Sequence, residues 1–140
     1  MGSKQYLHGY EPYEPAEGEE YMNPQQREHF RKILRAWKDE LVEEAERTVD
    51  HMKNEAVNYP DPNDRASQES EITLELRTRD RERKLIAKID EALSKLDLDE
   101  YGFCEACGAE IGIRRLEARP TATLCVDCKT LDEIKERQQG

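Results

Sequence analysis

Apolar residues are scarce in this sequence. Only 36% of the 140 residues are hydrophobic, against 39% charged, and there are two phenylalanines and one tryptophan. Such a composition leaves little material for a large core and favours an elongated, helix-rich molecule. No stretch approaches the roughly 18 consecutive apolar residues of a membrane span, and the N-terminal residues lack the pattern of a secretory signal. We therefore expect a cytoplasmic protein with no membrane partner.

The patterns typical of catalysis are also missing. We find no phosphate-binding glycine loop, no nucleophile elbow and no histidine–acid pair with useful spacing. The three histidines, His8, His29 and His51, are distant in sequence from any cysteine and are expected on the surface. A net charge of −10 opposes a general attraction to nucleic-acid phosphates. The sequence therefore predicts a protein that is not an enzyme and does not bind DNA sequence-specifically.

Cysteine occurs only four times, in two Cys-x-x-Cys pairs separated by seventeen residues. The pairs are Cys104 with Cys107 and Cys125 with Cys128. This spacing is typical of a four-thiolate zinc site. Two disulfides or unrelated core thiols are the alternative, which a reducing cytoplasm disfavours. Because four thiolates fill a tetrahedral zinc ion and leave no position for water or substrate, we expect the zinc to be structural.

A first long helix is predicted from near Asn23 to about Val57. Asn23 suits the N-cap, and Pro24 suits the first helical position because its ring presets φ. Apolar or small residues then recur at steps of three and four, which places them on one helical face. They are Phe30, Leu34, Trp37, Leu41, Ala45, Val49, Met52 and Ala56.

Residues 58–64 break this pattern with two prolines and predict a turn. Asp61 and Pro62 can start a second helix running to about Leu98. Its apolar stripe is Ile72, Leu76, Ile86, Ile89, Leu93 and Leu96, interrupted by the basic segment at 77–84. A fold-back about residue 62 places position 80 opposite position 44, so the basic segment would face the acidic residues 39–46. The result is an antiparallel hairpin of about 50 Å at 1.5 Å per residue.

The predicted fold class is mainly α. A long antiparallel coiled-coil hairpin (23–98, tip at 58–66) stands on a small globular base with a four-cysteine zinc finger and a C-terminal helix (99–140). The sequence T-L-D-E at 130–133 predicts the start of that helix, which should end near Gln139 and pack Leu131 and Ile134 on the hairpin base. Residues 1–22 form an irregular acidic arm whose tyrosines either dock on the folded part or remain solvated.

Two groups of charged residues have more than one interpretation. Asp61 and Asp64 at the turn are either helix-capping acids or carboxylates that reach a magnesium ion or a basic pocket in another molecule. The basic side chains either form internal salt bridges or bind a polyphosphate or an acidic protein face. They are Arg77, Arg79, Arg81, Arg83, Lys84, Lys88, Arg114, Arg115 and Arg119.

Three segments together resemble the DksA/TraR zinc-finger family of bacterial transcription factors. They are DPNDRA at the turn, ELRTRDRERKLIAKI on the second helix, and CEACGAEIGIRRLEARPTATLCVDCKTL at the cysteines. The resemblance extends from about Glu19 to the C-terminus. It implies a regulator that binds RNA polymerase directly and inserts its hairpin into the secondary channel. With ppGpp it would repress ribosomal RNA promoters and activate some amino-acid biosynthesis promoters in the stringent response.

The resemblance also implies roles for single residues. Asp61, Asp64 and Ala66 match the coiled-coil tip that lies near the polymerase active site. The positions matching the ppGpp site, formed together with the polymerase, are Lys88, Arg119 and Lys129, which contact phosphate, with Arg81 and Leu85 nearby. Two other functions stay open on the residues alone: a zinc-anchored coiled-coil adaptor without a role in the channel, and direct nucleic-acid binding through Arg114, Arg115 and Arg119.

Overall fold

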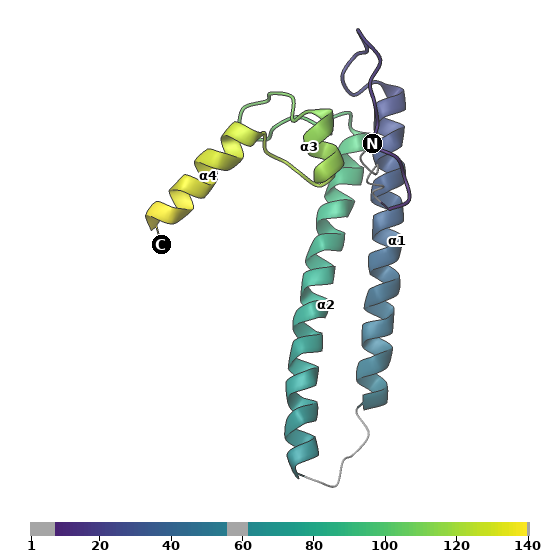
Figure 1. Cartoon of the computed structure of the whole chain (residues 1–140), viewed down its shortest axis with the longest axis vertical. Coiled ribbons are helices and arrows are strands. Elements are labelled where there is room, and N and C mark those ends of the chain that lie inside the picture. The colour runs from purple at the N-terminus through teal and green to yellow at the C-terminus, as the bar shows by residue number, and fades with distance from the viewer. Residues whose placement is uncertain (1–7, 56–61, 140) are drawn as a thin grey trace, which may run out of the picture.

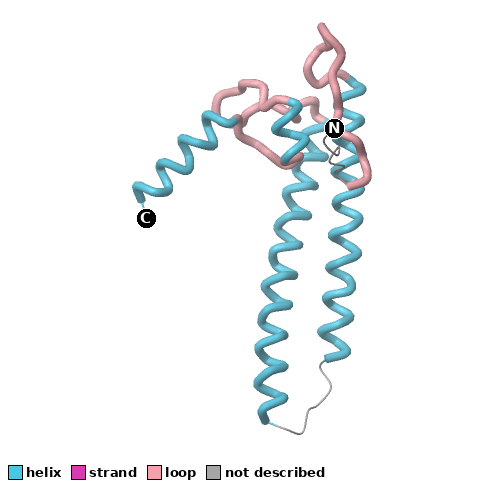
Figure 2. Tube along the Cα trace, in the orientation of Figure 1, coloured by secondary structure: helices cyan, strands magenta, loops and turns pink. Residues whose placement is uncertain are grey.

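The computed structural model describes residues 8–55 and 62–139. Within these ranges it contains four helices and no strand: α1 (Pro24–Glu55), α2 (Pro62–Asp97), α3 (Ile113–Ala118) and α4 (Val126–Gln139). The long helices α1 and α2 lie antiparallel, α3 lies beside the end of α2, and α4 projects away from the hairpin (Figures 1 and 2). None of the described helices combines the length and apolar character needed to cross a membrane. The predicted mainly helical hairpin on a small base is confirmed.

The start of α1 is fixed by side-chain caps. Asn23 Oδ1 accepts a hydrogen bond from the Gln26 N–H at 2.8 Å, and Gln26 Oε1 accepts one from the Met22 N–H at 2.7 Å. Gln26 Nε2 in turn donates to the Glu20 carbonyl at 3.1 Å. Gln26 is buried, and these bonds satisfy its polar atoms. The predicted asparagine cap is confirmed, and it also ties the preceding arm to the helix.

The hydrophobic core lies at one end of the hairpin. The buried apolar side chains of the long helices stop at Leu41 in α1 and begin at Ile89 in α2. They meet residues of the base, which we define as residues 99–125. The most deeply buried apolar side chains are Phe30, Ile33, Leu34, Ile89, Leu96 and Leu116. Each contributes ~1.5–3 kcal/mol by burial, so stability is concentrated where α1, α2 and the base meet.

Farther along the hairpin, the inner face of α2 carries charged side chains. Counting back from Ile86 in steps of four and three places Glu82, Arg79 and Glu75 on that face, and all three are half-buried. Leu76, predicted to lie in the apolar stripe, is 44% exposed, so that part of the prediction is wrong. Burial raises the pKa of the Glu82 carboxyl, and the nearby charge of Glu44 raises it further. The described part of the hairpin beyond Leu41 is therefore weakly packed.

The predicted register of the hairpin is also wrong. Lys38 Nζ lies 2.7 Å from Asp90 Oδ1, whereas a fold-back about residue 62 places position 86 opposite Lys38. His51 pairs with Glu75, two positions beyond the expected partner. The observed partners on α2 thus lie two to four residues beyond the expected ones, which is half a helical turn to one turn. We attribute this difference to packing at the base, which sets the register of the two helices in place of the turn sequence. None of the ion pairs recorded in the described chain involves a cation of residues 77–84. Among the described residues, that basic segment therefore forms none of the internal salt bridges that the sequence interpretation allowed.

Part of the N-terminal arm, from residue 8, docks on the folded chain. The His8 ring stacks on Trp37 with centroids 5.1 Å apart. The Tyr13 N–H donates to Glu117 Oε1 at 2.6 Å, and His29 Nε2 lies 2.5 Å from the same oxygen. The side chains of His8 and His29 are only 16% and 14% exposed, so the surface location expected for both is wrong. The arm thus connects α1 to the base, as one of the two sequence interpretations proposed.

The end of the arm also packs closely against the base. Tyr21 Oη donates to the Gly102 carbonyl at 2.6 Å and accepts from the Gly112 N–H at 3.0 Å. Gly102 has φ +93°, and a β-carbon there would lie 2.9 Å from Met22 Cγ and 3.0 Å from Tyr21 Oη. Only glycine fits this position without displacing the arm.

Gly102→Ala should therefore destabilise the protein by about 1–3 kcal/mol beyond the cost of its positive φ, because the added methyl group overpacks the contact with Met22. Equilibrium urea unfolding measures this difference. Gly18→Ala is the matched control, since Gly18 has φ +77° and a β-carbon there would have nothing within 4 Å. Equal losses for the two variants would contradict the packing argument.

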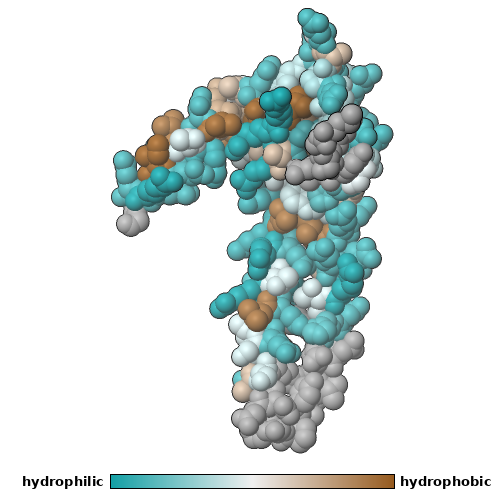
Figure 3. All heavy atoms as spheres, viewed as in Figure 1, coloured by the Kyte–Doolittle hydropathy of each residue, from teal (hydrophilic) through white to brown (hydrophobic). Residues whose placement is uncertain are grey.

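The beginning and packing of α4 differ from the prediction. The helix begins at Val126, and Thr130 lies inside it with Oγ1 donating to the Val126 carbonyl at 2.9 Å. The Cys128 N–H donates to Cys125 Sγ at 3.5 Å, so the second cysteine pair begins the helix in place of the expected capping box. Leu131 and Ile134 are 58% and 42% exposed and do not pack on the hairpin base; apolar surface is visible along α4 in Figure 3.

Candidate functional site

The four cysteine thiols lie together where the base meets the first turn of α4. Their Sγ atoms are all within 4.8 Å of one another, and those of Cys107 and Cys125 are 3.7 Å apart. Thiolates bound to zinc at about 2.3 Å in a tetrahedron are separated by about 3.8 Å. In the first pair, the Cys104 N–H donates to the Ala109 carbonyl at 2.8 Å, and the Gly108 N–H donates to the Cys104 carbonyl at 2.9 Å. These turns aim both pairs at one point, as the spacing predicts.

The electrostatics of the cluster favour a bound cation. Backbone N–H groups, chiefly that of Cys125, lower the pKa of the Cys104 thiol to about 6. The neighbouring sulfurs of Cys125 and Cys107 raise the pKa of the Cys128 thiol to about 12. The cluster therefore resists ionisation of all four thiols unless a positive ion compensates their charge. This all-thiol donor set fits a structural zinc ion, which would occupy all four sulfurs.

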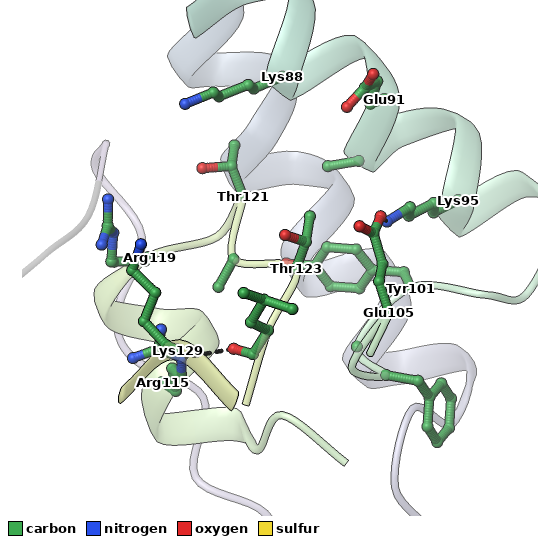
Figure 4. A pocket seen from close by; sticks show the side chains of 15 residues that line it. Lys88, Glu91, Lys95, Tyr101, Glu105, Arg115, Arg119, Thr121, Thr123 and Lys129 are labelled. Atoms are coloured by element: carbon green, nitrogen blue, oxygen red, sulfur yellow. Dashed lines mark hydrogen bonds and ion pairs between the residues drawn. The ribbon is translucent and has the colours of Figure 1, made fainter. Parts of the chain in front are cut away.

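A second candidate site lies between α2 and the base. It is an open pocket of about 270 Å³ (Figure 4). Its lining includes the cationic side chains of Lys88, Arg115, Arg119 and Lys129, which lie on one side of the view. On the other side are Glu91 and the ion pair of Lys95 with Glu105. Because four cations converge in a chain of net charge −10, the pocket is suited to an anion with several phosphates.

The fold brings together basic residues that are distant in sequence. Lys88 comes from α2, Arg119 follows the end of α3, and Lys129 lies in the first turn of α4. The buried Tyr101 donates from Oη to the Pro120 carbonyl at 2.6 Å and so holds the loop after α3 against the base. Burial raises the pKa of Tyr101 well above its usual range, which keeps this hydroxyl a donor. The three predicted phosphate-contacting residues therefore share one pocket.

Other predicted site residues lie elsewhere. Arg81 and Leu85 lie on α2 toward the turn and do not line the pocket. Asp61 lies outside the described residues, and Asp64 is described only as backbone in the first turn of α2. Ala66 is exposed on α2, at the end of the hairpin opposite the base (Figure 1). The sequence predicts Arg115 as one of several basic residues that could bind a polyphosphate, an acidic protein face or nucleic acid, but gives it no place in the ppGpp site. It does not predict Thr121 and Thr123, which also line the pocket.

The two parts of the chain match two family models. Residues 26–96 match the model described as DnaK suppressor protein DksA, N-terminal domain, which covers just over half of the chain. Residues 99–133 match the prokaryotic dksA/traR C4-type zinc finger. The chain belongs to the DksA family. The resemblance seen in the sequence is thereby confirmed, and the zinc-finger match includes all four clustered cysteines.

Several DksA proteins are similar to this chain over most of their length. The RNA polymerase-binding transcription factor DksA of Haemophilus influenzae is 64% identical over 132 residues, which cover 94% of this chain and 91% of the relative. The protein of the same name from Escherichia coli K12 is 63% identical, with 94% and 87% covered. These names describe transcription factors.

A solved structure of the family has the same fold. The transcription factor DksA2 of Pseudomonas aeruginosa superposes with a TM-score of 0.80 at 39% identity, covering 84% of this chain and 90% of that one. In this chain the DksA N-terminal match contains Lys88, while the zinc-finger match contains Arg115, Arg119 and Lys129. The pocket that these residues line therefore lies at the junction of the two family regions.

Proposed function

We propose that this chain is a DksA-type transcription regulator that binds RNA polymerase directly. The observation that carries the proposal is its identity of more than 60% to proteins named RNA polymerase-binding transcription factors. Its shape supports the same function: α2 has 36 residues, or about 54 Å at 1.5 Å per residue, and extends well beyond the core, which lies where α1, α2 and the base meet. A long thin hairpin of this kind suits entry into the secondary channel of RNA polymerase. The protein would therefore act in the cytoplasm, where the polymerase is.

In this proposal, Cys104, Cys107, Cys125 and Cys128 bind one structural zinc ion that fixes the base. The regulatory residues would be those of the predicted tip: Asp61 and Asp64, with Ala66, would reach the region of the polymerase active site. A factor changes initiation only if it binds one state of the initiation complex better than another. Carboxylates that make contacts in one state but not in the other would supply this difference in binding free energy. The outcome would be repression of ribosomal RNA promoters and activation of some amino-acid biosynthesis promoters.

The pocket at the base provides the second part of the mechanism. Lys88, Arg119 and Lys129 would bind the phosphates of ppGpp, and the open side of the pocket would be covered by the polymerase. Arg81 and Leu85, farther along α2, would extend the same interface. Because the ligand would bridge both proteins, it would stabilise the polymerase complex in which the two walls meet.

Lys88→Ala should raise the ppGpp concentration needed for a half-maximal effect by at least about tenfold, since a charge-assisted contact contributes roughly 1.5–3 kcal/mol. Run-off transcription from a ribosomal RNA promoter, titrated with ppGpp, measures this concentration. The response is compared with the effect of the same variant without ppGpp. Lys32→Ala is the control, because Lys32 is exposed on α1 and does not line the pocket. An unchanged titration for Lys88→Ala would contradict the assignment.

Competition for polymerase tests the proposed binding mode. A transcript-cleavage factor that occupies the secondary channel should displace this chain in proportion to its concentration. Binding without competition would favour a zinc-anchored adaptor that acts outside the channel.

A gel-shift assay at low salt should show little affinity for promoter DNA, since the net charge is −10.

A further inference from the structure

We infer that Arg115 is a fourth phosphate-binding residue of the pocket, oriented by the loop that leads into the zinc site. This inference rests on the proposed function of the pocket as a site for ppGpp. The residues assigned above by family resemblance are Lys88, Arg119 and Lys129, and Arg115 is not among them. The geometry of its side chain is the basis for adding it.

Arg115 lies one helical turn before Arg119. The Arg119 N–H donates to the Arg115 carbonyl at 2.8 Å, so the two side chains leave neighbouring turns of the chain on the same side. Both line the pocket with Lys129 (Figure 4). None of the ion pairs recorded in the described chain uses Arg115, so no carboxylate there neutralises it.

One nitrogen of Arg115 is already held in place. Its Nε donates to the Leu124 carbonyl at 3.0 Å, and the side chain is half-buried. A guanidinium has five N–H donors in a planar fork, so this bond leaves both terminal amino groups available for phosphate. A side chain fixed in this way loses less conformational entropy when it binds a ligand.

The partner carbonyl gives this arrangement a link to the metal centre. Leu124 immediately precedes Cys125, one of the clustered thiols. The turn that places the Cys125 sulfur therefore also places the carbonyl that orients Arg115. Arg114, the adjacent residue, has the same charge but is exposed and does not line the pocket. The two neighbouring arginines therefore differ in position: Arg115 lines the pocket and Arg114 does not.

The test substitutes both arginines in the full chain bound to RNA polymerase. Arg115→Lys keeps the charge but cannot hold the Leu124 carbonyl and present a fork together; Arg115→Gln removes the charge. We expect the half-effective ppGpp concentration to rise about threefold to tenfold for Arg115→Lys and further for Arg115→Gln. Arg114→Lys and Arg114→Gln, the matched controls, should titrate like the unsubstituted chain.

A second readout separates phosphate binding from a purely structural role. A ppGpp analogue lacking one phosphate should act more weakly than ppGpp on the unsubstituted chain, and this difference should shrink for Arg115→Lys, because the residue and the phosphate interact. Bound zinc is measured in every variant to detect a disrupted base. If Arg115→Gln loses zinc, its titration is set aside and the result for Arg115→Lys is used.

Two results would overturn the inference. If Lys88→Ala weakens the ppGpp response while both Arg115 variants titrate normally, the pocket binds ppGpp without Arg115. A second result concerns the analogue that lacks one phosphate. If Arg115→Lys weakens the ppGpp response but shows the same difference between ppGpp and the analogue as the unsubstituted chain, Arg115 has a structural role only. A normal titration for Lys88→Ala as well would instead overturn the proposed function of the pocket.

Discussion

Asp64→Asn is expected to lose most promoter regulation while polymerase affinity is retained. Asp64 lies in the first turn of α2, at the end of the hairpin opposite the base. Asparagine has nearly the same shape and removes only the negative charge. If that charge distinguishes two states of the initiation complex, its loss should reduce the effect on open-complex lifetime by about tenfold, equivalent to ~1.4 kcal/mol.

Open-complex lifetime on a ribosomal RNA promoter and binding to polymerase should be measured with the same preparation of this variant. Glu69→Gln is the matched control, because Glu69 is an exposed acid of α2 near the same end of the hairpin. The control should regulate normally. Normal lifetimes with Asp64→Asn would contradict the role of the tip, and a loss confined to affinity would make Asp64 a binding residue only.

Removal of the proposed zinc ligand Cys107 should have the largest effect on the base. Cys107 is exposed, so Cys107→Ser creates no cavity in the core and its effect reports the lost thiolate. The base contributes few buried apolar side chains of its own: Tyr101, Cys104, Ile111 and Leu116. Structural zinc contributes about 10–16 kcal/mol in isolated zinc-finger peptides, so the base should lose its fixed structure without it.

Hydrogen exchange measures this prediction by region. Amides of residues 99–125 should lose most protection in Cys107→Ser or after chelation, whereas the paired ends of α1 and α2 should keep more, since Phe30, Ile33 and Ile89 can still pack together. Regulation and the ppGpp response should be lost together, because Arg115, Arg119 and Lys129 all depend on the base. Ala106→Ser, at an exposed position between the first two cysteines, is the control. Full protection of the base without zinc would contradict the structural role of the metal.

The sequence predicts those parts of the structure that depend on local chemistry. The start of α1 follows from the Asn23 cap, and α2 begins at Pro62 as expected. The thiol cluster follows from the spacing of two tight turns. Family resemblance adds Lys88, Arg119 and Lys129, and the structure shows that these residues share a pocket.

The remaining features depend on packing between distant segments. The pairing of Lys38 with Asp90 is set by the core at the base, which no turn motif encodes. The capping sequence at Thr130 was a valid local signal, but the turn at Cys125 begins the helix first. Arg115 differs from Arg114 through its hydrogen bond to the Leu124 carbonyl, a contact that no sequence pattern predicts.

Site-specific crosslinking from the end of the hairpin tests the central proposal most directly. A photo-crosslinking amino acid replaces Ser67, which is exposed on α2 one residue after Ala66. In complexes with RNA polymerase, we predict crosslinks to the walls of the secondary channel near the active site, and their loss when a transcript-cleavage factor is added. Crosslinks to the outer surface of polymerase or to promoter DNA, unaffected by that factor, would contradict the account.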